Sequence, residues 1–277
     1  MNPSSHTPLA DDLTRLMDSS ANRRQSLRWL IACAAFPLAG CGGAGDETAD
    51  TVALSNTAGS SAACSVIPEE TGGPYPGDGT NRNSDGVANA LVLSGIVRSD
   101  IRASVAGASG VAQGIPLTIR LELVNVAANC AAAAGAAVYL WHCTREGGYS
   151  MYSNGIVNEN YLRGVQEADS QGVITFQTIF PGCYDGRMPH VHFEVYPSLA
   201  KAGSASNRVK TSQFAFPLAT LNEAYATSGY ATSVSNLARI SFATDNVFSD
   251  GTALQMASLT GNPTQGYVAT LTVGVSL

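Results

Sequence analysis

FPGCYDGRMPHVHFEVY, residues 180–196, places a turn directly before a strand-like run that carries two histidines. In HVHFEVY (190–196) apolar and other side chains alternate, so an extended backbone would turn the apolar ones to one face and His190 and His192 to the other. The pattern therefore predicts a strand that packs its apolar face on a core. Two imidazoles at this spacing are a natural pair of metal ligands, and zinc, copper or iron would each suit them.

Further strand-like runs surround this stretch. The clearest is PLTIRLELVN (116–125), in which polar and aliphatic side chains alternate with a period of two. The other predicted elements are strands at 90–97, 136–143, 172–180 and 266–277, a short helix at 218–226 and an irregular loop at 68–86. Many short strands with irregular loops predict an all-β protein with a β-sandwich core, without an internal repeat or a second domain boundary.

The composition agrees with a strand-rich globular protein of 277 residues. It is 45% hydrophobic and only 13% charged, with a formal net charge of −6. No cluster of Lys and Arg follows the first 30 residues or so, and nucleic acid is therefore not an expected partner.

Residues 1–40 are predicted to be a signal peptide rather than part of the fold. A paired arginine, Arg23 and Arg24, resembles a twin-arginine export signal, and LAGC (38–41) resembles a bacterial lipoprotein cleavage box. We expect cleavage before Cys41, a lipid on its thiol, a flexible tether over residues 41–62 and a folded domain over 63–277. An ordinary Sec signal peptide is the alternative. The expected location is the bacterial cell envelope, either facing the periplasm or on the outer membrane.

Four cysteines of the predicted domain are candidates for disulfides: Cys64, Cys130, Cys143 and Cys183. In an exported protein they predict two disulfides in one of three pairings, which the sequence does not choose among. Buried free thiols at Cys143 and Cys183 are the alternative.

The sequence around the histidines resembles the intradiol ring-cleavage dioxygenases, the family of catechol 1,2-dioxygenase and protocatechuate 3,4-dioxygenase. The resemblance is carried by GGYSMYS (147–153) and NYLRGVQEADSQGVITFQTIFPGCYDGRMPHVHFEV (160–195), by PEETGGPYP and VYLWHC upstream, and by KTSQFAFP and NVFSDG downstream. It implies a catalytic domain over 63–277 with the family's β-sandwich core and long loops. It also implies cleavage of a catechol-like ring by O₂ between the two hydroxylated carbons, giving a cis,cis-muconate-type diacid.

The same resemblance implies one mononuclear non-haem Fe(III) and the residues around it. The matching ligand positions are Tyr149, Tyr184, His190 and His192, with Tyr184 displaced when substrate binds. Arg187 is placed beside the bound ring, where a guanidinium would stabilise negative charge, and Gln213 is placed near the active site.

Other side chains near these motifs have competing interpretations. Tyr152 and Tyr161 are alternatives to Tyr149 as ligand. Glu194 and Tyr196 share the histidine face and are expected at a solvated edge, with hydrogen bonding to the ligands as the alternative.

His142 and Trp141 are expected to support the site by packing rather than to bind metal. Two functions compete with the dioxygenase. One is a non-catalytic β-sandwich lipoprotein that binds a metal or a partner, and the other is zinc-assisted hydrolysis, which paired tyrosines disfavour. The substrate is open, and so is assembly as a homo-oligomer, because the helical dimerisation region of better-known members has no counterpart here.

Overall fold

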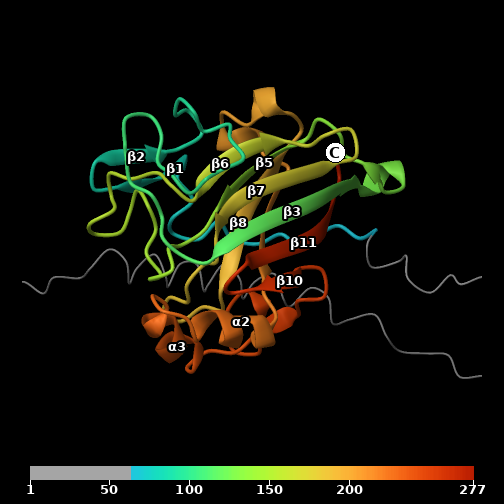
Figure 1. Cartoon of the computed structure of the whole chain (residues 1–277). Coiled ribbons are helices and arrows are strands. Elements are labelled where there is room, and N and C mark those ends of the chain that lie inside the picture. The colour runs from blue at the N-terminus through green and yellow to red at the C-terminus, as the bar shows by residue number, and fades with distance from the viewer. Residues whose placement is uncertain (1–63) are drawn as a thin grey trace, which may run out of the picture. The chain divides into compact units, whose positions relative to one another are not determined.

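The computed structural model describes residues 64–277, so the predicted signal peptide, Cys41 and the tether lie outside the described residues. In the described part strands predominate, and it contains no helix long and apolar enough to cross a bilayer. Two β-sheets form its body, and helices α2 (Leu218–Tyr225) and α3 (Ala231–Leu237) lie together at one end (Figure 1). The predicted all-β class with a β-sandwich core is confirmed.

The first sheet has five strands built around β3. Its members are β10 (Ser258–Asn262), β11 (Gly266–Val275), β3 (Pro116–Asn125), β4 (Ala131–Ala132) and β7 (Val173–Ile179). Strand β3 runs parallel to β11 and antiparallel to β4 and β7. The strands expected at 116–125, 172–180 and 266–277 are thus confirmed.

The second sheet has four strands and is antiparallel throughout. In spatial order these are β6 (Arg163–Glu167), β5 (Ala137–Trp141), β8 (His190–Tyr196) and β9 (Lys210–Ala215). Strands β5 and β8 confirm the predictions at 136–143 and 190–196, and α2 confirms the helix at 218–226. Short 3₁₀ turns join the elements: η1 (Val126–Ala128), η2 (Leu199–Lys201), η3 (Ala205–Asn207) and η4 (Phe248–Asp250).

Alternate side chains of β8 lie on opposite faces of the second sheet, and one of these faces packs on the main core. Val191, Phe193 and Val195 are fully buried in the main hydrophobic cluster, together with the aliphatic side chains of β3. Burial of side chains of this size stabilises the fold by about 1.5–3 kcal/mol each. His190 and His192 must therefore lie on the other face of the second sheet, away from the main core.

Two sequence-based expectations are wrong in detail. Residues 90–97 form turns rather than a strand, because the run is apolar without a period of two. Leu91 and Ile96 pack inward while Val92 is 67% exposed. The expected irregular loop at 68–86 contains strand β1 (Asp78–Asn83), which forms a hairpin with β2 (Gly86–Asn89).

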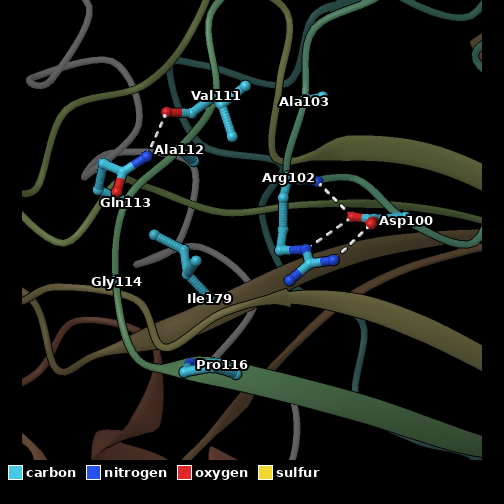
Figure 2. Close-up of a pocket in the computed structure, with 9 residues that line it drawn as sticks. All are labelled: Asp100, Arg102, Ala103, Val111, Ala112, Gln113, Gly114, Pro116 and Ile179. Atoms are coloured by element: carbon cyan, nitrogen blue, oxygen red, sulfur yellow. Dashed lines mark hydrogen bonds and ion pairs between the residues drawn. The ribbon is translucent and has the colours of Figure 1, made fainter.

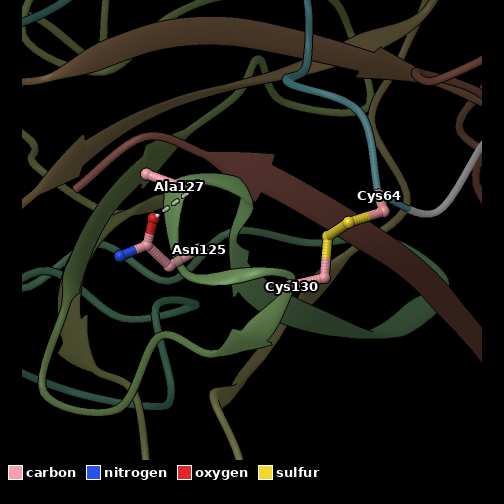
Figure 3. The surroundings of a disulfide bond; sticks show 4 residues. All are labelled: Cys64, Asn125, Ala127 and Cys130. Carbon is pink, nitrogen blue, oxygen red and sulfur yellow. Dashed lines mark hydrogen bonds between the residues drawn. A yellow bond between two sulfur atoms is a disulfide. The ribbon is translucent and has the colours of Figure 1, made fainter.

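One disulfide is present in the described part of the chain, between Cys64 and Cys130 (Figure 3). It ties the first described residue to the turn after β3, where the Asn125 side chain accepts a hydrogen bond from the Ala127 amide (3.1 Å). Closing a loop of this length, 66 residues, reduces the entropy of the unfolded chain by an amount worth about 4 kcal/mol. The expectation of two disulfides is wrong, since Cys143 and Cys183 are buried free thiols.

Candidate metal centre

The two histidines of β8 converge on one point. Their Nε2 atoms lie 3.0 Å apart, and the side chains are only 1% and 2% exposed. Two nitrogens bound to one metal ion at about 2.1 Å, with bonds meeting near a right angle, are separated by about this distance. The pair is therefore spaced for a shared ion.

Two tyrosines from different loops reach the same point. Tyr149 follows β5, and Tyr184 lies in the turn before β8, where its hydroxyl is 3.2 Å from His190 Nε2. The two phenol rings meet edge to face, with centroids 5.8 Å apart. Within residues 64–277 the buried Tyr149 hydroxyl has no hydrogen-bond partner. The structure thus brings together the four residues that the resemblance singled out.

The competing tyrosines do not join this group. The Tyr152 hydroxyl donates to Asn81 Oδ1 (2.6 Å) and accepts from the Gly77 amide (2.8 Å), so it is already engaged. Tyr161 packs in a separate hydrophobic cluster with Leu162.

Neighbouring groups fix the imidazoles. His190 Nδ1 is 2.6 Å from the Met188 carbonyl oxygen, which can only accept, so Nδ1 carries the proton and Nε2 keeps its lone pair. Trp141 stacks on His192, as expected of a packing residue. His142 has both ring nitrogens engaged, with the Cys143 carbonyl (2.8 Å) and the Thr178 hydroxyl (2.7 Å), which agrees with a structural role.

Burial sets the protonation of the four groups. It lowers the pKa of His190 and of His192 well below the usual range, so both imidazoles are neutral. Burial also raises the pKa of Tyr149 well above that of a free phenol, with a further contribution from Tyr184, whose own pKa is raised mainly by burial. Deprotonation of either phenol therefore requires a compensating positive charge.

The donor set fits a hard, highly charged cation. It consists of two neutral imidazoles and two phenols, and one of the phenols, that of Tyr149, has no hydrogen-bond partner in the described part of the chain. Across the described residues no group of three or more His, Cys, Asp or Glu side chains could hold a metal, so any ion here depends on the tyrosines. Phenolate oxygen suits Fe(III), whereas zinc favours His, Cys and carboxylate.

Arg187 and Gln213 stand together beside this centre. Arg187 Nη2 donates to Gln213 Oε1 (2.7 Å), and Gln213 lies directly opposite His192 in the β8–β9 register. Gln213 Nε2 donates in turn to the Thr71 carbonyl (2.7 Å). The structure therefore links the two residues expected near the substrate to each other and to a ligand strand.

Asp245 is a site residue that the sequence analysis missed. Its fully buried carboxylate accepts from Arg187 Nε (2.9 Å) and from the Met188 amide (2.7 Å) through one oxygen. The other oxygen accepts from the Val247 and Phe248 amides (2.8 and 3.0 Å). The only signal was its place directly before NVFSDG, because its partner lies 58 residues away.

The expectation of a solvated edge at Glu194 and Tyr196 is wrong. Both side chains are buried, and the Tyr196 hydroxyl donates to Glu194 Oε2 (2.6 Å). Burial raises the pKa of Glu194 to about 8. Strand β8 is covered on both faces along its whole length, and no residue of it reaches solvent.

Residues 71–77 cover the centre. A Cβ on Gly73 would lie 3.3 Å from His192 Cε1, and the Tyr75 ring packs on the Tyr149 ring with centroids 4.9 Å apart. We call residues 71–77 the covering segment.

A surface cavity of about 300 Å³ lies elsewhere, between residues 100–116 and Ile179 (Figure 2). Arg102 and Asp100 form an ion pair at its side (2.7 Å). None of the residues of the candidate centre lines this cavity, so it is not part of the candidate metal site.

Comparisons with known proteins show what this chain is similar to. The family model described as "Dioxygenase" matches residues 100–202, a range that includes Tyr149, Tyr184 and both histidines but not Gln213 or Asp245. A comparison with curated protein sequences found no significant match.

Among solved structures, an intradiol ring-cleavage dioxygenase from Tetranychus urticae is 24% identical over 77% of this chain and 95% of its own, with a TM-score of 0.58. A second dioxygenase crystal structure has the same identity and coverage and a TM-score of 0.59. At these identities the likeness establishes the fold. The chain therefore has the fold of the intradiol ring-cleavage dioxygenases, and its residues 100–202 match a dioxygenase family model.

Proposed function

We propose that the chain is a non-haem Fe(III) dioxygenase that opens a catechol-type ring between its two hydroxylated carbons with O₂, giving a cis,cis-muconate-type diacid. The observation that carries the proposal is the meeting of two histidine Nε2 atoms with two phenol hydroxyls, of which that of Tyr149 has no other partner in the described chain. Tyr149, Tyr184, His190 and His192 would hold the iron.

Bound Fe(III) would supply the positive charge that stabilises both phenolates and the deprotonated catechol and that draws electron density from the ring. Tyr149 is fully buried under Tyr75 and stays in place. Tyr184 sits on a turn whose next two residues, Asp185 and Gly186, are exposed. Its phenolate oxygen is therefore the one able to move away and take a proton from the substrate.

Arg187 supplies the fixed positive charge for the reacting ring. Its guanidinium is oriented by Asp245 and Gln213 and is 11% exposed, so its charge acts in a site largely free of water. Negative charge developing on the substrate carbon is stabilised by such a group without reorganisation. By accepting a hydrogen bond from Arg187, Gln213 holds the guanidinium next to β8, the strand that carries the two histidines.

The visible spectrum of the iron-loaded chain tests the proposal. Phenolate bound to Fe(III) gives an intense charge-transfer band, and catechol should shift it to longer wavelength before O₂ is consumed. A chain that stays colourless after iron reconstitution would leave a metal- or partner-binding lipoprotein as the better account. A colourless chain that binds zinc stoichiometrically would favour the hydrolytic alternative.

We further propose that the protein is exported and anchored in the bacterial cell envelope by a lipid on Cys41. The support is the LAGC box and the paired arginines Arg23 and Arg24. Incorporation of a labelled fatty acid into the wild-type chain but not into Cys41→Ser would establish the anchor, and equal labelling of both would reject it.

A further inference from the structure

Arg163 is a fully buried guanidinium at the edge of the candidate centre. It is the first residue of β6, 1% exposed, and among the largest fully buried side chains. In the part of the chain that the structure describes, no carboxylate lies within ion-pair distance of it. A buried charge without a counter-ion is costly, so its hydrogen bonds must stabilise it.

All five N–H groups of this guanidinium have acceptors. Nε donates to Ser150 Oγ (3.2 Å), Nη1 to the Pro76 carbonyl (2.7 Å) and the Tyr139 hydroxyl (3.1 Å), and Nη2 to the carbonyls of Tyr75 (3.0 Å) and Ser150 (2.9 Å). One side chain thus joins the covering segment to the turn that follows Tyr149. The planar fork of arginine can satisfy these acceptors together, whereas a lysine has three donors at one point.

Both joined segments touch the proposed ligands. Ser150 is the neighbour of Tyr149 in the chain, and the Tyr75 ring packs on the Tyr149 ring. Arg163 also lies opposite Trp141 in the β5–β6 register, and Trp141 stacks on His192. Arg163 therefore contacts or pairs with residues that are direct neighbours of Tyr149 and of His192, two of the four proposed ligands.

The covering segment leaves room for this side chain. Gly77 has a φ of +62°, and a Cβ there would lie 2.8 Å from Arg163 Nη1. The Tyr152 ring closes the remaining side, with the guanidinium carbon 5.4 Å from its centroid. Glycine is therefore favoured at position 77 for two reasons: its positive φ, and the lack of space for a Cβ beside the Arg163 guanidinium.

We propose that Arg163 is a positioning residue that fixes the Tyr149 hydroxyl relative to the two histidine nitrogens by holding the covering segment and the Tyr149 turn in one arrangement. The expected effects on the iron-loaded chain rest on the proposed function of the centre. The arrangement of the two segments does not, because it can be measured in the metal-free chain.

Two variants and one control test it in the full chain. Arg163→Lys keeps the charge and loses the fork, and Arg163→Met loses both. Arg98→Lys is the control, because Arg98 also bonds backbone carbonyls, those of Arg163, Asn160 and Ala103, but neither segment.

The first readout is hydrogen exchange in the metal-free chain, which needs no iron. Both Arg163 variants should speed exchange in peptides covering residues 72–78 and 147–153, and Arg98→Lys should not. The second readout uses the iron-loaded chain. Both Arg163 variants should shift the phenolate band and lower kcat on the order of 100-fold, with a smaller change in KM.

Three results would overturn the proposal. One is Arg163 variants that lose thermal stability like Arg98→Lys but keep wild-type exchange in both segments. Another is faster exchange with an unchanged band and kcat. The third is an Arg163→Lys chain that behaves like wild type while Arg163→Met fails, since charge rather than the fork would then act. A wild-type chain that takes up no iron would reject the proposed function, while the exchange readout would still decide whether Arg163 holds the two segments.

Discussion

The indole of Trp141 lies parallel to the imidazole of His192, with ring centroids 4.9 Å apart and 3° between the ring planes. The two residues face each other across β5 and β8, in a row that continues to Arg163 on one side and Gln213 on the other. A single row of cross-strand neighbours thus connects the residue proposed to position Tyr149, a proposed ligand and a residue proposed to lie near the substrate.

This stacking should orient His192 for metal binding. Trp141→Leu keeps an apolar side chain but removes the flat surface, so the ring of His192 gains freedom and the core loses packing. We expect a loss of about 2–4 kcal/mol in unfolding free energy and fewer iron atoms per chain. Trp141→Phe keeps an aromatic face and should retain iron more fully. Equal iron content in both variants would show that the stacking does not orient the ligand.

The hydroxyl of Tyr149 should destabilise the metal-free chain. Among the described residues it is buried without a hydrogen-bond partner, so Tyr149→Phe should raise the unfolding free energy of the metal-free chain by about 1 kcal/mol while abolishing the phenolate band's contribution from this residue. Tyr152→Phe, which loses two hydrogen bonds, should cost about 1–2 kcal/mol and leave the band unchanged. Denaturant titrations of the metal-free variants, paired with visible spectra of the iron-loaded ones, measure both effects. A less stable Tyr149→Phe would mean that the hydroxyl has a partner in solution.

The carboxylate of Asp245 should be needed for both stability and activity, because it holds the Arg187 guanidinium in position. Asp245→Asn keeps the shape of the side chain but removes the charge opposite Arg187, which frees the guanidinium from its position. We expect a loss of about 2–4 kcal/mol in stability and at least a tenfold fall in kcat. Asp185→Asn removes a carboxylate of a largely exposed ion pair with Arg239 and should change stability by less than about 0.5 kcal/mol. Equal effects of the two substitutions would show that the Asp245–Arg187 pair has no special role.

The contrast between these residues shows what the sequence could predict. Strand β8 was predictable because apolar and polar side chains alternate along it, and the spacing of its two histidines made them metal-ligand candidates. The full set of four ligand candidates came from the resemblance to the intradiol dioxygenases. Arg163 and Asp245 are joined to the site by contacts between residues far apart in the chain. Strand β6, RGVQE, lacks an apolar alternation, so neither the strand nor its buried arginine was expected.

Burial also explains the wrong expectations. Glu194 has the charge of a surface residue, but the hydroxyl of Tyr196, two residues away on the same face of β8, donates to it in the interior. What the sequence did not reveal is that residues far away in the chain, such as Leu91 and Ile96, cover this face. The run 90–97 is apolar enough for a strand, yet it forms turns in which buried and exposed side chains follow no period of two. Cys64 pairs with Cys130 because the fold brings the start of the described chain next to the turn after β3. The spacing of the cysteines in the sequence does not reveal this proximity.

Glu70 should make the chain less stable as pH rises through the neutral range. Burial raises its pKa from 4.5 to about 7, with the Gln255 hydrogen bond opposing the shift. Between pH 4.5 and 7 the folded chain holds a proton that the unfolded chain releases, so raising the pH in this window disfavours folding. The stability of Glu70→Gln relative to wild type should therefore increase from pH 5 to pH 7. The slope should be well below the maximum of about 1.4 kcal/mol per pH unit, because the group is partly exposed.

Glu69→Gln is the matched control for this titration. Glu69 is the exposed neighbour and is ion-paired with Lys210 (3.1 Å), so its substitution removes one carboxylate and leaves the buried one in place. Denaturant titrations at pH 5, 6 and 7 compare the three chains. A constant difference between Glu70→Gln and wild type over this range would contradict the raised pKa.

Gly73 should be required by the metal centre and not only by the backbone. Its φ of +68° favours glycine, and an added Cβ would press on His192 Cε1 at 3.3 Å. Gly107 has a similar φ of +93° but open space where a Cβ would lie, so Gly107→Ala isolates the backbone strain. Both substitutions to alanine should cost about 1 kcal/mol in unfolding free energy. Only Gly73→Ala should also weaken iron binding, because the His192 ring must shift from its position beside His190 to accommodate the added Cβ. Iron titrations followed by the visible band would separate the two effects, and equal iron affinity in both variants would show that the covering segment does not press on the ligand.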